Sequence, residues 1–207
     1  MNNKFIKIII ATGGTGGHIF PAYSLAKHLS DNSIDVKITS DKRGLKYLQN
    51  YQSLKVIKIS STTIFKKNIF QLLFSILVIF FSILRSFIFL SINRPNLVFG
   101  MGGYSSFPVC IAAKILRIPF IIYENNLYLG KANRYLLPYA KKIFVSYKEL
   151  EGISEKYHKK VYEIGNIIRK EILNFKIKSD FNQNEKKLKI LILGGSQAAK
   201  IFAEKLT

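Results

Sequence analysis

The sequence predicts an α/β fold built around an open parallel sheet. Short apolar runs of strand type alternate with segments of helix length along most of the chain. Glycine-rich turns follow three of these runs, and the first run, Phe5–Ala11, is apolar almost throughout, as is typical of a buried parallel strand. Ligands of such sheets collect at the carboxyl ends of the strands, so functional residues are expected there.

The strand-like runs and the helix-like segments follow one another in a regular order. Strands are expected at Phe5–Ala11, Ile34–Thr39, Leu54–Ser60, Leu97–Gly100, Phe120–Tyr123 and Lys142–Ser146, and helices at Pro21–Leu29, Gly44–Tyr51, Ile69–Ile92 and Phe107–Leu116. The first run is too short for a signal peptide with its cleavage site and ends in glycines. It is therefore expected to be a strand and not a targeting segment.

A change in composition divides the chain into domains. Residues 1–175 carry the alternating pattern, whereas residues 176–187 are polar, charged and without periodicity, which is typical of a linker. A further strand and a glycine turn then open a new βα unit over residues 188–207. One strand and one short helix cannot form a core. We therefore expect a complete first domain followed by the start of a second.

The composition excludes several classes of protein. Of the 207 residues, 48% are hydrophobic, which excludes a disordered or fibrous chain. The single cysteine, Cys110, excludes an intramolecular disulfide framework and is typical of a reducing compartment. It lies in an apolar helical segment, where a small buried side chain is expected in preference to a catalytic thiol.

The chain is strongly basic, and the charge is unevenly distributed. The formal net charge is +20, and no acidic residue lies between Asp41 and Glu124, whereas eleven Lys and Arg residues do. This pattern predicts an anionic partner: phosphate, nucleic acid or anionic lipid. Nucleic acid is not expected, because no recognition motif is present and the aromatic residues lie in apolar runs.

The longest apolar stretch, Ile69–Ile92, is long enough to span a bilayer and contains one charge, Arg85. Three interpretations compete: a core helix, a transmembrane span, and a helix lying on the membrane surface. A span would place the strands on either side of it on opposite sides of the membrane. We favour a helix of the domain that exposes an apolar face to an anionic membrane, flanked by Lys66, Lys67 and Arg94.

A first glycine cluster, residues 13–17, follows the first strand and precedes His18. Such a turn lets the backbone approach a ligand, and the next helix presents its N–H groups, so phosphate or diphosphate binding is expected. Pro21 is expected in the first turn of that helix. The P-loop and dinucleotide patterns do not fit. Asp41, after the second strand, keeps a nicotinamide-dependent oxidoreductase open as an alternative.

Two further glycine clusters, Gly100–Gly103 and Gly194-Gly195, also follow strands, which indicates several phosphates or a diphosphate. His18 is placed to act as a general base or to bind a diphosphate, the alternative being a helix-capping role. Glu124 follows the fifth strand as a carboxylate among cations, the alternative being a surface salt bridge. No cluster has metal-ligand spacing, so neither a metal nor a cofactor is expected.

Five motifs in order resemble the bacterial MurG family of transferases. They are GGTGGHIFPA (Gly13–Ala22), GMGGYSSFP (Gly100–Pro108), YENN (Tyr123–Asn126), GNIIR (Gly165–Arg169) and GGSQAA (Gly194–Ala199). The family usually has His-Glu-Gln-Asn in place of YENN and Gly-Asn-Pro-x-Arg in place of GNIIR. Without that proline, the turn that presents Arg169 is less constrained.

The resemblance implies a GT-B fold of two Rossmann-like domains, the second truncated here, and an inverting, metal-independent transfer of N-acetylglucosamine from UDP-GlcNAc to lipid I, forming lipid II for peptidoglycan synthesis. It implies catalytic roles for His18, Tyr104 and Glu124, UDP-sugar contacts by Thr15, Gly16, Gly17, Asn126, Arg169 and Ser196, and acceptor-diphosphate contacts by Gly13, Gly14, Gly102 and Gly103. It also implies peripheral attachment to the cytoplasmic face of the inner membrane.

Most of the family's donor domain has no counterpart in these 207 residues. We therefore also weigh a split enzyme, completed by a separate carboxy-terminal donor-domain chain, and an inactive acceptor domain that binds polyprenyl-diphosphate lipid.

Overall fold

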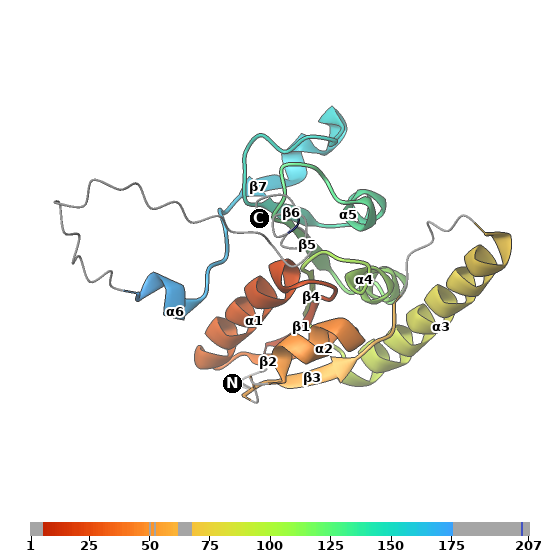
Figure 1. The fold of residues 1–207 in the computed structure, drawn as a ribbon, viewed down its shortest axis with the longest axis horizontal. Helices are drawn as coiled ribbons and strands as arrows, with labels where there is room; N and C mark the ends of the chain where they lie inside the picture. The colour runs from red at the N-terminus through yellow and green to blue at the C-terminus, as the bar shows by residue number, and fades with distance from the viewer. Residues whose placement is uncertain (1–5, 50, 52, 62–67, 176–203, 205–207) are drawn as a thin grey trace. The chain divides into compact units, whose positions relative to one another are not determined.

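The computed structural model describes residues 6–49, 51, 53–61, 68–175 and 204 (Figure 1). The chain divides into two compact units, residues 1–169 and residues 170–207. The first unit contains the sheet. In the second unit the described residues include the short helix α6 (Lys170–Leu173). The expected linker and most of the expected second domain lie outside the described residues.

The first unit contains a seven-stranded sheet in the order β3-β2-β1-β4-β5-β6-β7, with every neighbouring pair parallel. The strands are β1 (Lys7–Ala11), β2 (Asp35–Ser40), β3 (Lys55–Lys58), β4 (Leu97–Gly100), β5 (Phe120–Glu124), β6 (Lys142–Val145) and β7 (Val161–Glu163). The chain winds from β1 toward one edge and from β4 toward the other (Figure 1). The carboxyl ends of β1 and β4 therefore form a topological switch point.

The predicted α/β class with a parallel sheet is confirmed, and the six strands predicted within residues 1–175 are present with ends that differ by at most two residues. The seventh strand, β7, was not predicted. It contains three residues, of which two are exposed. Such a short strand at the edge of the sheet has no apolar run from which to predict it.

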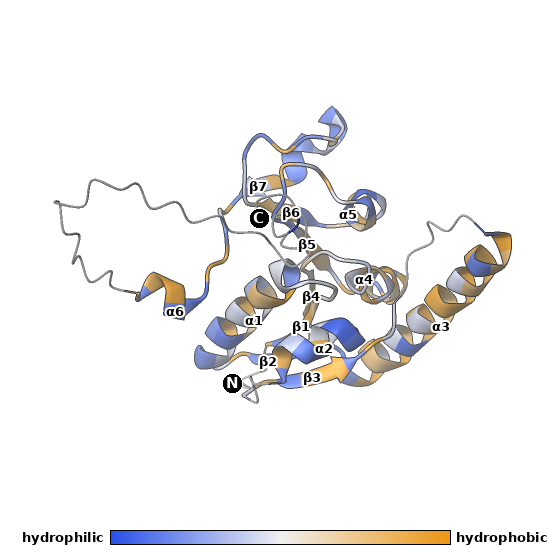
Figure 2. Ribbon diagram, in the orientation of Figure 1, coloured by the Kyte–Doolittle hydropathy of each residue, from blue (hydrophilic) through white to orange (hydrophobic). Residues whose placement is uncertain are grey.

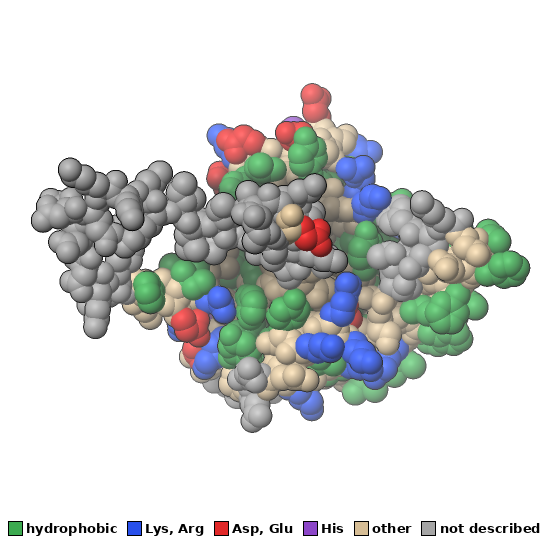
Figure 3. Space-filling view, in the orientation of Figure 1, with side chains coloured by type: hydrophobic (Ala, Val, Ile, Leu, Met, Phe, Trp, Pro, Cys, Tyr) green, Lys and Arg blue, Asp and Glu red, His purple; other side chains and the backbone are tan. Residues whose placement is uncertain are grey.

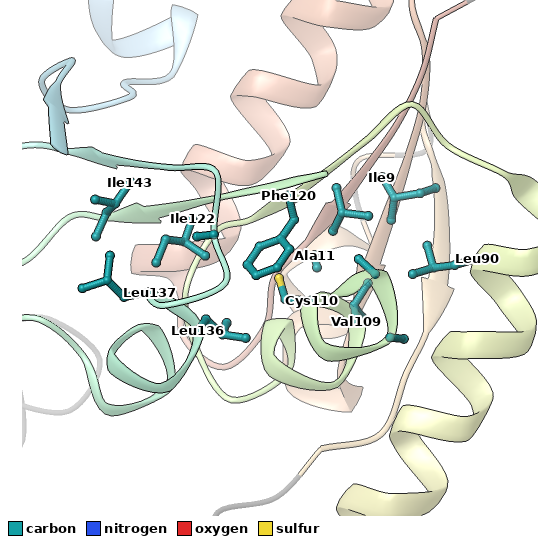
Figure 4. Close-up of a cluster of buried hydrophobic side chains, with 14 of the residues drawn as sticks. Ile9, Ala11, Leu90, Val109, Cys110, Phe120, Ile122, Leu136, Leu137 and Ile143 are labelled. Atoms are coloured by element: carbon teal, nitrogen blue, oxygen red, sulfur yellow. The ribbon is translucent and has the colours of Figure 1, made fainter. Parts of the chain in front are cut away.

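Helices cover both faces of the sheet: α1 (Gly16–Asp31), α2 (Lys42–Leu48), α3 (Ile69–Asn93), α4 (Ser106–Ile115) and α5 (Lys131–Leu136). Because side chains alternate along a strand, β1 contributes to two separate cores. Ile8 and Ile10 pack in the cluster that includes residues of α1 and α2. Ile9 and Ala11 pack in the cluster that includes residues of α3, α4 and α5 (Figure 4).

Helix α1 begins earlier than expected, at Gly16, so the placement of Pro21 in the first turn was wrong: it lies inside the helix. A proline there lacks the N–H that would bond to the carbonyl four residues before it, which is that of Gly17. The side chain of Asn125 donates to this Gly17 oxygen at 3.0 Å. A residue of a distant loop thus supplies the bond that the helix lacks.

Helix α3 has one narrow buried side. Its buried residues are Ser75, Ser82, Ser86 and Leu90, and its main helical neighbour is α4. The hydroxyls of Ser82 and Ser86 donate back to the carbonyls of Val78 and Ser82. Small side chains, with their polar groups satisfied within the helix, let α3 lie close to the domain.

The other side of α3 is an exposed apolar surface, orange along the helix in Figure 2 and green in Figure 3. This α3 apolar face consists of Ile69, Phe70, Leu73, Phe74, Ile76, Leu77, Phe80, Phe81, Leu84, Ile88 and Ile92. Among the described helices, α3 alone is long and apolar enough to cross a membrane. However, β3 and β4, which precede and follow it, belong to one sheet, so α3 does not divide the domain.

The thiol of Cys110 is fully buried in α4, and burial raises its pKa. It packs against β4 so closely that a Cβ atom at Gly100 would lie 2.7 Å from its sulfur. Both observations support the expectation of a core residue over a catalytic thiol.

The two sides of α3 predict opposite responses to truncation. Leu90→Ala, at a fully buried position, is expected to lower the free energy of unfolding by about 2–5 kcal/mol, because it removes core contacts and leaves a cavity. Phe80→Ala, at a position 59% exposed, is expected to change it by about 0.5 kcal/mol or less. Urea unfolding midpoints measure both. Equal effects would contradict this orientation of α3.

Candidate active site at the switch point

The first two glycine clusters pack directly against each other at the switch point. A Cβ atom at Gly13 would lie 2.1 Å from the hydroxyl of Ser105, and one at Gly103 would lie 2.7 Å from the carbonyl oxygen of Gly13. Gly102 and Gly103 also have φ values of +80° and +73°, which favour glycine. These glycines are therefore required by the packing of the two turns, in addition to any role in binding a ligand.

Asp41 holds the first glycine turn. Its buried carboxylate accepts hydrogen bonds from the N–H groups of Gly14 at 3.1 Å and Gly44 at 2.8 Å, and it pairs with Arg43 at 3.5 Å. The Gly14 N–H is therefore engaged by the protein itself. A nicotinamide-dependent oxidoreductase would need the Asp41 carboxylate to bind a ribose, but this carboxylate is already occupied.

His18 lies in the first turn of α1 and packs against the second glycine turn. A Cβ atom at Gly102 would lie 2.9 Å from its Nδ1. Burial lowers the pKa of its imidazole, while the charge of Glu124 and a hydrogen bond to the backbone of Met101 raise it in part. The N-cap of α1 is Thr15, so His18 does not cap this helix. A neutral imidazole with one nitrogen engaged leaves the other able to accept a proton.

Glu124 ends β5 and is only 2% exposed. One carboxylate oxygen accepts from the backbone N–H of Asn126 at 3.2 Å and from its side-chain Nδ2 at 2.7 Å. The other accepts from the backbone N–H of Gly130 at 2.8 Å and from the side chain of Asn133 at 3.0 Å. The alternative of a surface salt bridge is wrong, because the carboxylate is buried and its partners are amide groups.

These residues surround one hollow of about 150 Å³. The residues that line it are His18, Gly102, Gly103, Tyr104, Glu124, Asn126, Gly130, Lys131, Ala132 and Asn133. The three expected catalytic residues are thus brought together. The segment 130–133 was not anticipated, since it starts a helix of six residues that is too short for an apolar period.

A second group of expected residues gathers beside α1. Arg169 lies 4.4 Å from the centre of the Phe20 ring, in a cation–π contact. A Cβ atom at Gly16 would lie 2.9 Å from the same ring. Thr15 makes no side-chain capping bond, and Gly17 is exposed. Ser196 lies outside the described residues.

The segment that carries Arg169 is held by Tyr123, although it lacks the family's proline. The Tyr123 hydroxyl lies within hydrogen-bond distance of the carbonyl of Gly165, at 3.2 Å, and of the N–H of Ile167, at 3.4 Å. The YENN and GNIIR motifs, distant in the sequence, therefore meet at the end of β5. Among the described residues, no three His, Cys, Asp or Glu side chains gather as metal ligands would.

A parallel sheet with helices on both faces and glycine turns at its switch point defines a Rossmann-like domain. Residues 8–145 match the glycosyltransferase family 28 N-terminal domain. The chain belongs to glycosyltransferase family 28 and, within it, to the MurG family. This assignment replaces the oxidoreductase alternative.

Curated relatives resemble nearly all of this chain. Proteins of Pelagibacter ubique and Rickettsia canadensis are each 38% identical to it, over 197 and 198 residues, or 95% and 96% of the chain. Both are named UDP-N-acetylglucosamine–N-acetylmuramyl-(pentapeptide) pyrophosphoryl-undecaprenol N-acetylglucosamine transferase. The chain spans 53% and 54% of their lengths, so it corresponds to about half of each.

Solved structures agree with this assignment. MurG of Acinetobacter baumannii superposes with a TM-score of 0.70 at 26% identity, covering 98% of this chain and 56% of that one. The sheet thus matches the N-terminal half of a GT-B enzyme. UDP-GlcNAc 2-epimerase from Neisseria meningitidis, at 18% identity and a TM-score of 0.54, covers 78% of this chain and 47% of that one and shares the fold alone.

The buried imidazole of His18 predicts a pH-dependent stability. Its folded pKa lies below 6.5, the ordinary value, so below about pH 6.5 the unfolded chain binds more protons than the folded chain. The stability associated with neutral His18 is therefore fully present above that pH and is lost as the pH falls through the folded pKa. His18→Gln is expected to unfold with a smaller loss of stability between about pH 7.5 and 5.5.

Urea unfolding at the two pH values measures this difference. The matched control is His158→Gln, a change at an exposed histidine, which is expected to keep the wild-type slope. An unchanged slope in His18→Gln would contradict the burial argument.

Proposed function

We propose that this chain provides the acceptor half of a transferase that moves N-acetylglucosamine from UDP-GlcNAc to undecaprenyl-pyrophosphoryl-N-acetylmuramoyl-pentapeptide (lipid I), giving lipid II. The observation that carries the proposal is the convergence of His18, Tyr104, Glu124 and Asn126 on one hollow at the switch point of a family 28 domain. The names of the curated relatives supply the substrates.

In the proposed reaction, His18 acts as the general base. The 4-hydroxyl of the muramoyl group loses its proton to the imidazole while its oxygen bonds to the anomeric carbon of the donor sugar. The bond from that carbon to UDP breaks, and UDP leaves with the electron pair, which inverts the configuration. The lowered pKa of His18 keeps it ready to accept a proton, and the charge of Glu124 favours the imidazolium that forms.

The acceptor diphosphate and the donor are assigned to different residues at this edge of the sheet. We assign the acceptor diphosphate to the turns at Gly13-Gly14 and Gly102-Gly103. We assign the donor to Thr15, Gly16, Gly17, Asn126, Arg169 and Ser196. Helix α1, of 16 residues, points its N-terminus at the same edge and favours negative charge there. Because Gly14 already donates to Asp41, its contribution comes from the shape of the turn and not from its N–H.

A complete transferase needs a donor half. We propose that residues 1–175 form the acceptor domain, that residues 176–187 link it onward, and that residues 188–207 begin the donor domain. The remainder comes from the same polypeptide or from a separate chain.

We further propose that the domain lies on the cytoplasmic face of the inner membrane through the α3 apolar face. Support comes from its eleven exposed apolar side chains and from the basic residues around it, Arg85 and Arg94 among those described. Lys66 and Lys67, also expected to flank it, lie outside the described residues. Apolar insertion and attraction to anionic headgroups reinforce each other at such a surface.

The transferase proposal predicts activity that depends on a donor half. Radiolabelled N-acetylglucosamine transfer from UDP-GlcNAc to a lipid I analogue in anionic vesicles is measured with the chain alone and with the carboxy-terminal half of the Pelagibacter ubique relative added. Transfer is expected only with that half present, and His18→Ala is expected to reduce it by about a hundredfold or more. Lipid I binding without any transfer would indicate an inactive domain that only binds the acceptor lipid. Absence of lipid I binding would overturn the proposal.

The membrane proposal predicts weaker binding when the α3 apolar face is made polar. Phe74→Ser combined with Phe80→Ser is expected to reduce sedimentation with anionic vesicles by about tenfold or more, since two rings that insert into the lipid are lost. Ile6→Ser, at an exposed apolar position outside α3, serves as the control and is expected to bind as the wild type does. Equal binding by the double variant would show that another surface makes the contact.

A further inference from the structure

The usual hydrogen-bond acceptor sites of the Glu124 carboxylate are all occupied. A carboxylate offers about four lone-pair sites, and Glu124 accepts four hydrogen bonds, from the backbone and side chain of Asn126, from Gly130 and from Asn133. Proton transfer to or from a substrate would require breaking part of this network. The geometry therefore does not favour a general acid or base.

The same network fixes the orientation of a neighbouring amide. An ionised carboxylate only accepts hydrogen bonds, so the atom of the Asn126 side chain that faces it, at 2.7 Å, must be Nδ2. The carbonyl oxygen of that side chain is then turned away from Glu124. Asn126 is exposed and lines the hollow, so its side chain is accessible to a ligand.

We propose that Glu124 is a positioning residue that locks the Asn126 amide with its carbonyl oxygen toward the bound sugar. The site then selects a sugar group that donates a hydrogen bond, such as a hydroxyl or the N–H of an acetamido group. The proposal rests on the proposed function in taking the donor sugar as the ligand of Asn126. It assigns Glu124 a role different from the catalytic one expected from the sequence.

The second carboxylate oxygen extends this lock to α5. It holds the N–H of Gly130 and the Asn133 side chain, which also donates to the carbonyl of Tyr123 at 2.9 Å. A Cβ atom at Gly130 would lie 3.1 Å from this oxygen, so the turn approaches closely. Asn126 is thus held against a lining segment that is itself anchored.

Exchanging the carboxylate of position 124 and the amide of position 126 separates a positioning role of Glu124 from an acid–base role. In Glu124→Gln, either the NH2 group of the new amide faces the NH2 group of Asn126, or Asn126 turns its carbonyl oxygen toward position 124. In the double variant E124Q/N126D, the amide introduced at position 124 donates to the carboxylate introduced at position 126, while the oxygen of the new amide still accepts from Gly130 and Asn133. The backbone N–H of residue 126 loses its acceptor at position 124 in both variants, so it does not distinguish them. That variant again presents an acceptor oxygen to the hollow, but position 124 has no carboxylate.

The first measurement is the side-chain amide spectrum of the full chain labelled with ¹⁵N-asparagine and ¹⁵N-glutamine. We expect one Asn126 amide proton shifted downfield and protected from exchange, and we expect both features to disappear in Glu124→Gln. The Asn166 amide, which donates to the Tyr147 hydroxyl, is the internal control and is expected to stay unchanged. In the exchange variant, a protected side-chain amide at position 124 is expected. An Asn126 signal that is identical in Glu124→Gln would overturn the proposal.

The second measurement is transfer in the vesicle assay with the donor half supplied. Glu124→Gln is expected to raise KM for UDP-GlcNAc about tenfold with a smaller change in kcat, because the Asn126 oxygen no longer accepts one hydrogen bond from the sugar. The exchange variant is expected to recover most of that loss. If it shows the protected amide at position 124 but remains as impaired as Glu124→Gln, mainly in kcat, the carboxylate itself is required and the positioning role is wrong.

The two proposals fail in different ways. Absence of transfer with wild-type protein under all conditions would overturn the proposed function. The amide spectrum would still decide whether Glu124 fixes Asn126.

Discussion

The reversal of winding between β1 and β4 is the constraint on which the site depends. It brings two backbone turns into one crevice, where side chains would collide, so each turn is made of glycine and fits into the other. A Cβ atom at Gly13 would collide with the side chain of Ser105, and one at Gly103 would collide with the backbone of Gly13. The location of His18 follows from them, since its ring fills the space beside Gly102.

Around this crevice, side-chain hydrogen bonds connect several loops to one another. Asp41 takes the Gly14 N–H, Asn125 takes the Gly17 carbonyl that Pro21 leaves free, and Glu124 takes the donors of the loop that follows it. These bonds tie the ends of β2 and β5 to the start of α1 and to the turn before α5. The hollow is therefore bounded by segments that restrain one another, which favours a preformed shape over one assembled on binding.

The sequence was sufficient for the class of fold, for six of the seven strands and for the glycine turns, because apolar runs and glycines are local signals. It was also sufficient to single out His18 and Glu124. It could not show that Glu124 is saturated by Asn126, Gly130 and Asn133, because hydrogen bonds follow from loop geometry and leave no period in the sequence. The start of α1 was misplaced for a similar reason: Pro21 usually marks a first turn, and its compensation by Asn125 is tertiary.

The exposed side of α3 also bears on how the molecule behaves away from lipid. Eleven large apolar side chains face water on a chain of net charge +20. In dilute buffer, like charge keeps copies apart, but at about 0.1 M salt the repulsion extends only about 10 Å. Ionic strength therefore sets whether two such surfaces can meet. In water, the salt concentration therefore decides whether copies of the protein associate, and a higher concentration favours self-association through α3.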